Sequence, residues 1–97
     1  MTKELKCGEY SNYITNTKEV LDGIQYIFEF ENNYGASVVK FAGTYGYAND
    51  LWELGVLYFD DDGYCLTYDT PITNDVIGYL TDEGVCAVLK NIKSLED

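Results

Sequence analysis

The chain has 97 residues, with 6 Lys, 17 Asp and Glu, no His and no Arg, so its formal net charge is −11. Without histidine it lacks the commonest general base and metal ligand, and without arginine it lacks the side chain that binds phosphate through two parallel hydrogen bonds. Direct binding of nucleic acid or of an anionic membrane is excluded, because both depend on Lys and Arg to neutralise phosphate. The composition favours a binding protein over an enzyme, and we expect no cofactor and no metal.

The remaining composition predicts one folded domain over residues 1–97. Hydrophobic residues make up 46% and aromatic residues 15% of the chain, with one proline, which is enough apolar material for a core. No apolar run approaches the roughly 20 residues that span a bilayer, and no signal peptide opens the chain, so we expect a cytoplasmic protein. Cys7, Cys65 and Cys86 are far apart in sequence. Their number and spacing indicate three partly buried thiols in a reducing compartment rather than a disulfide framework or a zinc site.

The first half of the chain predicts an irregular N-terminal segment (1–23) followed by a hairpin. The first eighteen residues are weakly patterned and favour a loop or a poorly specified edge strand. After the Asp22-Gly23 turn signal, residues 24–31 alternate between apolar and polar, which predicts a strand. A turn over 32–35 and a β-rich segment over 37–41 predict its hairpin partner. The side chains expected on the core face of the first strand are Ile24, Tyr26, Phe28 and Phe30.

Two further strands are predicted after a loop rich in glycine and tyrosine (43–50). Residues 51–59 alternate again, and the run Asp60-Asp61-Asp62-Gly63 is a turn signal that precedes a fourth strand over 64–68. The sheet is therefore expected within 24–68. The better core face of the third strand comprises Trp52, Leu54, Val56 and Tyr58.

The last third of the chain, 72–95, predicts helices. Thr73 or Asn74 can cap a short helix that ends at Leu80, and Thr81 can cap a longer one. The apolar residues of the longer helix recur at helical spacing, at Val85, Val88, Leu89, Ile92 and Leu95. The predicted fold class is α+β: an antiparallel meander of about four strands with one short and one longer C-terminal helix packed on one face.

The negative charge is concentrated in the middle of the chain. Residues 19–89 contain 13 acidic residues and one lysine, Lys40, whereas the two ends together hold 5 lysines and 4 acidic residues. A surface with this negative charge either keeps the protein soluble or lets it dock on a basic host protein or nucleoprotein complex and block it. The candidate partner-binding residues, with tyrosine and tryptophan as packing anchors, are Glu29, Glu31, Glu53, Asp60, Asp61, Asp62 and Asp69.

Two local motifs have alternative interpretations. On a calcium-loop template the Asp60–Asp62 triplet would place Tyr58 at the first ligand position, and strands flank it, so a solvated hairpin turn is the better prediction. The loop residues Tyr45, Gly46 and Tyr47, with Trp52, form a candidate ligand loop in which aromatic rings stack on a base. No Lys or Arg in the loop balances a phosphate, and ordinary strand-end structure is the alternative. No spacing among the 17 acidic residues selects a catalytic pair.

Residues 34–95 resemble a family of short acidic proteins of unknown function encoded by tailed bacteriophages and prophages. The motifs that carry the resemblance are YGASVV (34–39), YG (45–46), LWELGVL (51–57) and LTYDTPITNDVIGYLT (66–81). The resemblance implies a phage origin and an accessory role in the host cytoplasm, and it attaches no catalytic residue.

We therefore expect a non-enzymatic inhibitor of a host defence system, of the anti-CRISPR or anti-restriction type, that binds a basic nucleic-acid-binding surface. The alternatives are a protein that sequesters a nucleotide second messenger, with the glycine and tyrosine loop at a homo-oligomer interface, and a virion accessory protein.

Overall fold

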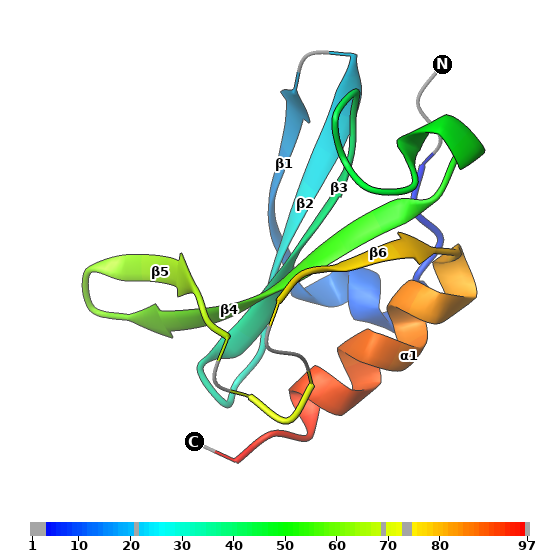
Figure 1. The fold of residues 1–97 in the computed structure, drawn as a ribbon. Coiled ribbons are helices and arrows are strands. Elements are labelled where there is room, and N and C mark those ends of the chain that lie inside the picture. Colours follow the sequence, from blue (N-terminus) through cyan, green and yellow to red (C-terminus); the bar gives the residue numbers. More distant parts are fainter. Residues whose placement is uncertain (1–3, 21, 69, 73–74, 97) are drawn as a thin grey trace.

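The computed structural model describes residues 4–20, 22–68, 70–72 and 75–96. In this part of the chain, six strands form one sheet and one α-helix, α1 (Asp82–Lys93), packs across it (Figure 1). Two 3-10 helices, η1 (Gly8–Tyr13) and η2 (Tyr47–Asn49), lie in the connections. The strands are β1 (Ile14–Val20), β2 (Gly23–Glu29), β3 (Tyr34–Lys40), β4 (Trp52–Asp60), β5 (Gly63–Leu66) and β6 (Ile77–Leu80).

The sheet is an antiparallel meander in the order β1-β2-β3-β4-β5. Both β5 and β6 pair with the outer edge of β4, β5 along residues 57–60 and β6 at Trp52 and Leu54. The predicted α+β class and antiparallel meander are confirmed, with more strands than the four expected. One of the additional strands is β1, which lies at the sheet edge within the weakly patterned segment.

The predicted short helix up to Leu80 is wrong, because residues 77–80 form strand β6. Its proposed caps, Thr73 and Asn74, lie outside the described residues. A helix of so few residues is marginal on its own, whereas the edge of β4 beyond β5 offers unpaired backbone groups to a segment that contains β-branched Ile77. Residues 72–95 therefore hold one strand and one helix.

The main core lies between the sheet and α1. It confirms the predicted core face of the first strand and, on the third strand, Trp52, Leu54 and Val56. Half-buried Tyr58 lies outside the core cluster, and its ring contacts that of Tyr34 at a centroid distance of 5.2 Å. Thr81 caps α1 as predicted, since its Oγ1 accepts a hydrogen bond of 3.0 Å from the Gly84 N–H. The sequence did not reveal that Asn32, in the β2–β3 turn, donates from Nδ2 to the carbonyls of Ile92 and Leu95 at 2.9 Å. The core residues contributed by the strands, by Phe30 directly after β2 and by α1 are Tyr26, Phe28, Phe30, Ala36, Val38, Trp52, Leu54, Val56, Val85, Leu89 and Ile92.

The three cysteines have different environments. Cys7 is buried and Cys86 is half-buried, and burial raises the pKa of both thiols. Cys65 on β5 is exposed, so the prediction of three partly buried thiols is wrong for this residue. A raised pKa disfavours the thiolate, which is the nucleophilic form. Within the described residues, no helix has the length and apolarity needed to cross a membrane.

Candidate functional site

The face of the sheet opposite α1, here called the second face, has an apolar layer of its own. Ile27, Val39 and Leu57 are buried there outside the main core cluster. Gly35 and Gly55 allow large side chains to lie flat on this face. A Cβ added at Gly35 would come within 2.7 Å of a ring carbon of Phe59, and one added at Gly55 within 2.7 Å of Leu66 Cδ2.

The β4–β5 hairpin extends the second face beyond the body of the protein (Figure 1). Register pairs Phe59 with Tyr64, whose ring centroids are 5.2 Å apart, and Leu57 with Leu66. Tyr64 is 47% exposed and Leu66 46% exposed. Tyr68, two residues after the end of β5, is also exposed. The hairpin therefore presents aromatic and aliphatic side chains to solvent at a sheet edge.

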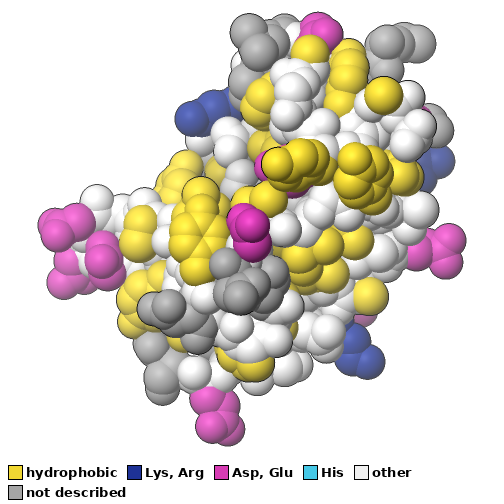
Figure 2. Space-filling model, in the orientation of Figure 1, with side chains coloured by type: hydrophobic (Ala, Val, Ile, Leu, Met, Phe, Trp, Pro, Cys, Tyr) yellow, Lys and Arg dark blue, Asp and Glu magenta, His cyan; other side chains and the backbone are white. Residues whose placement is uncertain are grey.

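The tip of the hairpin carries the densest negative charge. Asp60, Asp61 and Asp62 are all exposed, and Figure 2 shows acidic side chains gathered at the end of the projecting hairpin. Asp60 Oδ1 accepts a hydrogen bond of 2.9 Å from the Asp62 N–H, and Gly63 adopts a left-handed φ of 121°. The predicted hairpin turn is confirmed. Among the described residues, no group of three or more His, Cys, Asp or Glu side chains is placed to hold a metal ion.

Two more predicted acidic residues, Glu29 and Glu53, border the second face. Glu53 is half-buried, stands in register with Gln25 and Val39, and its Oε1 accepts a hydrogen bond of 2.8 Å from the Tyr45 N–H. Glu29 is exposed, and the strand register places it opposite Gly35, which pairs with Leu57, which in turn pairs with Leu66.

The remaining two predicted acidic residues are not part of this group. Glu31 is exposed in the β2–β3 turn, and Asp69 lies outside the described residues. The structure thus brings Glu29, Glu53 and the Asp60–Asp62 triplet to the borders of one partly apolar face.

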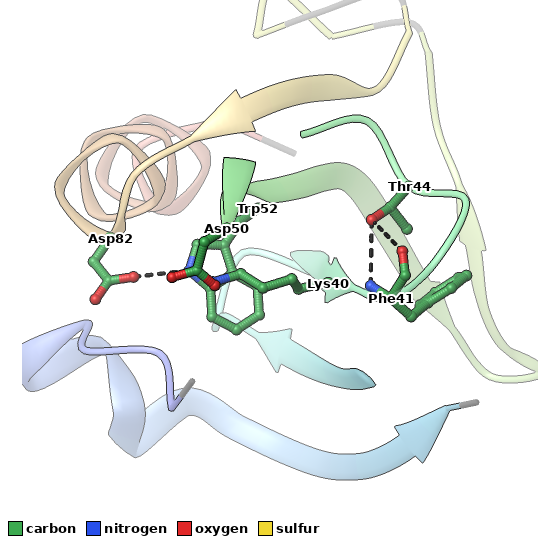
Figure 3. A network of polar contacts seen from close by, with 6 residues as sticks. All are labelled: Lys40, Phe41, Thr44, Asp50, Trp52 and Asp82. Atoms are coloured by element: carbon green, nitrogen blue, oxygen red, sulfur yellow. Dashed lines mark hydrogen bonds and ion pairs between the residues drawn. The ribbon is translucent and has the colours of Figure 1, made fainter. Parts of the chain in front are cut away.

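Lys40, the single basic residue between 19 and 89, is inside the protein. Its side chain is 4% exposed, its Nζ lies 3.0 Å from Asp50 Oδ1, and it sits 4.2 Å from the Trp52 ring centroid. The Trp52 Nε1–H in turn donates to Asp82 Oδ1 at 2.7 Å, which connects β3, β4 and α1 (Figure 3). A paired carboxylate and an aromatic face offset the cost of burying the cation. Between 19 and 89, the described surface therefore has negative charges and no exposed lysine.

The residues of the candidate ligand loop are not assembled into a cradle. Trp52 is 1% exposed and faces α1, because the alternation of β4 puts it in the core, away from the exposed Tyr45 ring. The Tyr47 hydroxyl donates to Asp22 Oδ2 at 3.0 Å, and this hydrogen bond raises the pKa of Tyr47. Gly46 is buried with a left-handed φ of 97°. Within this loop Tyr45 is exposed and Tyr47 is half-buried, so the candidate ligand loop stays a prediction.

Sequence reasoning missed a pair of exposed tyrosines beside Glu53. Tyr45 and Tyr79 are each 60% exposed, and the Tyr79 N–H donates to the Tyr45 carbonyl at 3.4 Å. Tyr79 has a left-handed φ of 58°, and glycine at 78 leaves room for Tyr45, whose Cβ would be 2.5 Å from an added Cβ. The high tyrosine content, ten residues, was the only sequence feature that pointed to such a pair. Neither the spacing of Tyr45 and Tyr79 nor any periodicity predicts that they lie side by side.

No family model, no curated protein and no solved structure matches this chain. The resemblance to short acidic phage proteins stays a prediction.

Proposed function

We propose that this protein is a non-enzymatic binding protein that attaches to a Lys- and Arg-rich surface of another protein. The observation that carries the proposal is the arrangement on the β4–β5 hairpin, where the acidic triplet Asp60–Asp62 adjoins the exposed apolar side chains of Tyr64 and Leu66. Burial of Lys40 leaves this negative field without an exposed lysine anywhere in the described part of 19–89.

The arrangement has the general anatomy of a protein interface. A few side chains in the apolar centre of an interface, tyrosine prominent among them, supply most of its binding energy, and a charged rim sets orientation and partner choice. A cluster of acidic side chains also accelerates encounter with a basic surface, and salt weakens this effect. The β4–β5 hairpin supplies both components on one short element, with anchors at Tyr64 and Leu66 and charge at its tip.

For the biological role, we propose a phage-encoded inhibitor that acts in the host cytoplasm on a defence system of the CRISPR or restriction type. The support is the resemblance to short acidic phage proteins together with the chemistry of the targets. RNA-guided nucleases hold nucleic acid in a positively charged channel, which complements an acidic protein. Occupying that channel would block nucleic acid without any catalytic step.

The test is binding to a fluorescein-labelled arginine- and glycine-containing peptide, followed by fluorescence anisotropy. We expect saturable binding at about 0.05 M salt that weakens at least tenfold at about 0.5 M, where exposed charges are screened within roughly 5 Å. The triple variant Asp60→Asn, Asp61→Asn, Asp62→Asn should lose most of this binding. Leu66→Ser should weaken it through loss of the apolar anchor.

The matched control removes the same number of negative charges elsewhere. Glu4, Glu9 and Glu96 are exposed and lie outside 19–89, so changing all three to Gln should leave binding close to wild type. Equal loss in the two triple variants would mean that net charge alone attracts the peptide, and would refute a specific surface.

The inhibitory role is tested in cells that carry a restriction or CRISPR system. Expression of the wild-type chain should raise the plating efficiency of a restricted phage, and the Asp60–Asp62 triple variant should not. Equal protection by the two proteins would contradict the assigned surface.

A further inference from the structure

A groove on the second face lies beside Glu53 and has a volume of about 210 Å³. Its lining mixes one acidic, two neutral polar and several apolar side chains. Gly55 lies in the groove, and its missing side chain leaves the space that Leu66 Cδ2 partly fills. The side chains that define the groove are Gln25, Ser37, Val39, Glu53, Leu66 and Val76.

The polar groups of the groove are held in position. The Tyr45 N–H donates to Glu53 Oε1 at 2.8 Å, which leaves a carboxylate with further acceptor sites, since each oxygen has two. Gln25 Nε2 donates to Ser37 Oγ at 2.8 Å, which orients the Gln25 amide, and the amide oxygen of a glutamine can accept two hydrogen bonds. Fixed acceptors next to a half-buried carboxylate favour a cationic ligand that carries several N–H donors.

The apolar side chains decide which cation fits. Val39, Leu66 and Val76 provide a surface for the methylene stem of a long basic side chain. A guanidinium is planar, weakly hydrated and rich in donors, whereas an ammonium is compact and strongly hydrated. A partly apolar groove with separate acceptors therefore suits arginine better than lysine.

We propose that this groove is a specific subsite for one arginine side chain of the basic partner, with Glu53 as its counter-ion. The inference rests on the proposed function and deepens it by assigning a residue type to a place on the second face. The hairpin tip attracts a basic surface in general, while the groove recognises a single arginine.

The probe is Nα-acetyl-arginine N-methylamide, titrated into the ¹⁵N-labelled full chain and followed by NMR. We expect saturable shifts at the Gln25 side-chain amide and at the Ser37 and Val39 backbone amides, with an affinity of roughly 1 mM. The corresponding lysine derivative should bind several-fold more weakly. The citrulline derivative, a neutral isostere of arginine, should give no saturable shifts.

Variants separate the groove from the rest of the surface. Glu53→Gln should weaken arginine binding about tenfold while its amide oxygen still accepts from the Tyr45 N–H, and an unchanged NMR spectrum elsewhere verifies folding. Gly55→Ala should also weaken binding, since the added methyl narrows the groove and displaces only the flexible end of Leu66. Glu9→Gln, at an exposed residue outside the candidate surface, is the control and should bind arginine as the wild type does.

Several results would overturn the subsite: equal binding of arginine and citrulline, equal binding of arginine and lysine, or no loss in Glu53→Gln. Such a failure is distinguishable from failure of the proposed function. A chain that still binds the basic peptide in a salt-dependent way, and loses this binding in the Asp60–Asp62 triple variant, would keep the proposed function even if the groove did not select arginine.

Discussion

The ion pair between Lys40 and Asp50 predicts an asymmetric response to mutation. The two partners differ in burial, because the Lys40 side chain is 4% exposed and the Asp50 side chain 49% exposed. Removing the lysine leaves a carboxylate that water can solvate. Removing the negative charge of the aspartate leaves an ammonium that water barely reaches.

The magnitudes follow from this difference. Asp50→Asn should cost about 2 kcal/mol in the free energy of unfolding, below the 3–5 kcal/mol for breaking a fully buried pair, because Asp50 is half exposed. Asparagine is the suitable replacement, since residue 50 has a left-handed φ of 61° that asparagine tolerates. Lys40→Met should cost no more than about 1 kcal/mol, because the loss of the ion pair and of the contact with Trp52 is offset by the relieved desolvation of the ammonium.

Equilibrium urea denaturation of the wild type and the two variants measures the difference. The midpoint should fall clearly more for Asp50→Asn than for Lys40→Met, with unchanged dependence on urea. If Lys40→Met is the more damaging substitution, the lysine is contributing net stability, and the reasoning from burial is wrong.

Three further predictions concern the scaffold. Asn32→Ala removes the donor to the carbonyl of Ile92, in the last turn of α1, and to that of Leu95, just after the helix. It should lower the free energy of unfolding by about 1–2 kcal/mol, measured by urea denaturation with the variant of an exposed asparagine as control. The Asp22–Tyr47 hydrogen bond should stabilise the fold only between two pH limits. Hydrogen bonds from the Ala42 N–H and from the Tyr47 hydroxyl lower the pKa of Asp22 below 3.8, so the stabilisation is lost as pH falls through the pKa that Asp22 has in the folded protein. The hydrogen bond to Asp22 raises the pKa of Tyr47 above 10.0, so the stabilisation is also lost as pH rises through the pKa that Tyr47 has in the folded protein. The stability difference between wild type and Tyr47→Phe should therefore be largest near neutral pH, and a difference that is constant with pH would contradict this. Gly35→Ala should lower the free energy of unfolding by more than about 3 kcal/mol, because the added Cβ would overlap the backbone oxygen of Phe28. Gly43→Ala meets open space and should lower it by about 1 kcal/mol, because residue 43 has a left-handed φ. Thermal denaturation of the two variants measures the difference.

The candidate surface could be predicted only in part. A count of charges located the negative field within 19–89 and selected the Asp60–Asp62 triplet, because a run of aspartates before glycine is recognisable locally. The count did not show that Lys40 is buried, with its Nζ paired to Asp50. Trp52 was expected both in the core and beside a ligand loop, and only the first expectation agrees with its 1% exposure. Because Lys40 and Trp52 are buried, the surface lacks the positive charge and the aromatic ring that the sequence alone would have allowed there.

The sequence by itself determined the features that depend on neighbours a few residues apart. Period-two alternation defined the core faces of two strands, and helical spacing with Thr81 as cap defined α1, because these patterns reflect the local geometry of strands and helices. Only the tertiary structure decided that residues 77–80 pair with β4 as a strand, and that Asn32 caps α1 from a distant turn. It also decided that Gln25 on β2, Glu53 on β4 and Val76 before β6 line one groove. Each of these features depends on pairing between segments remote in sequence, whose partners no local pattern specifies.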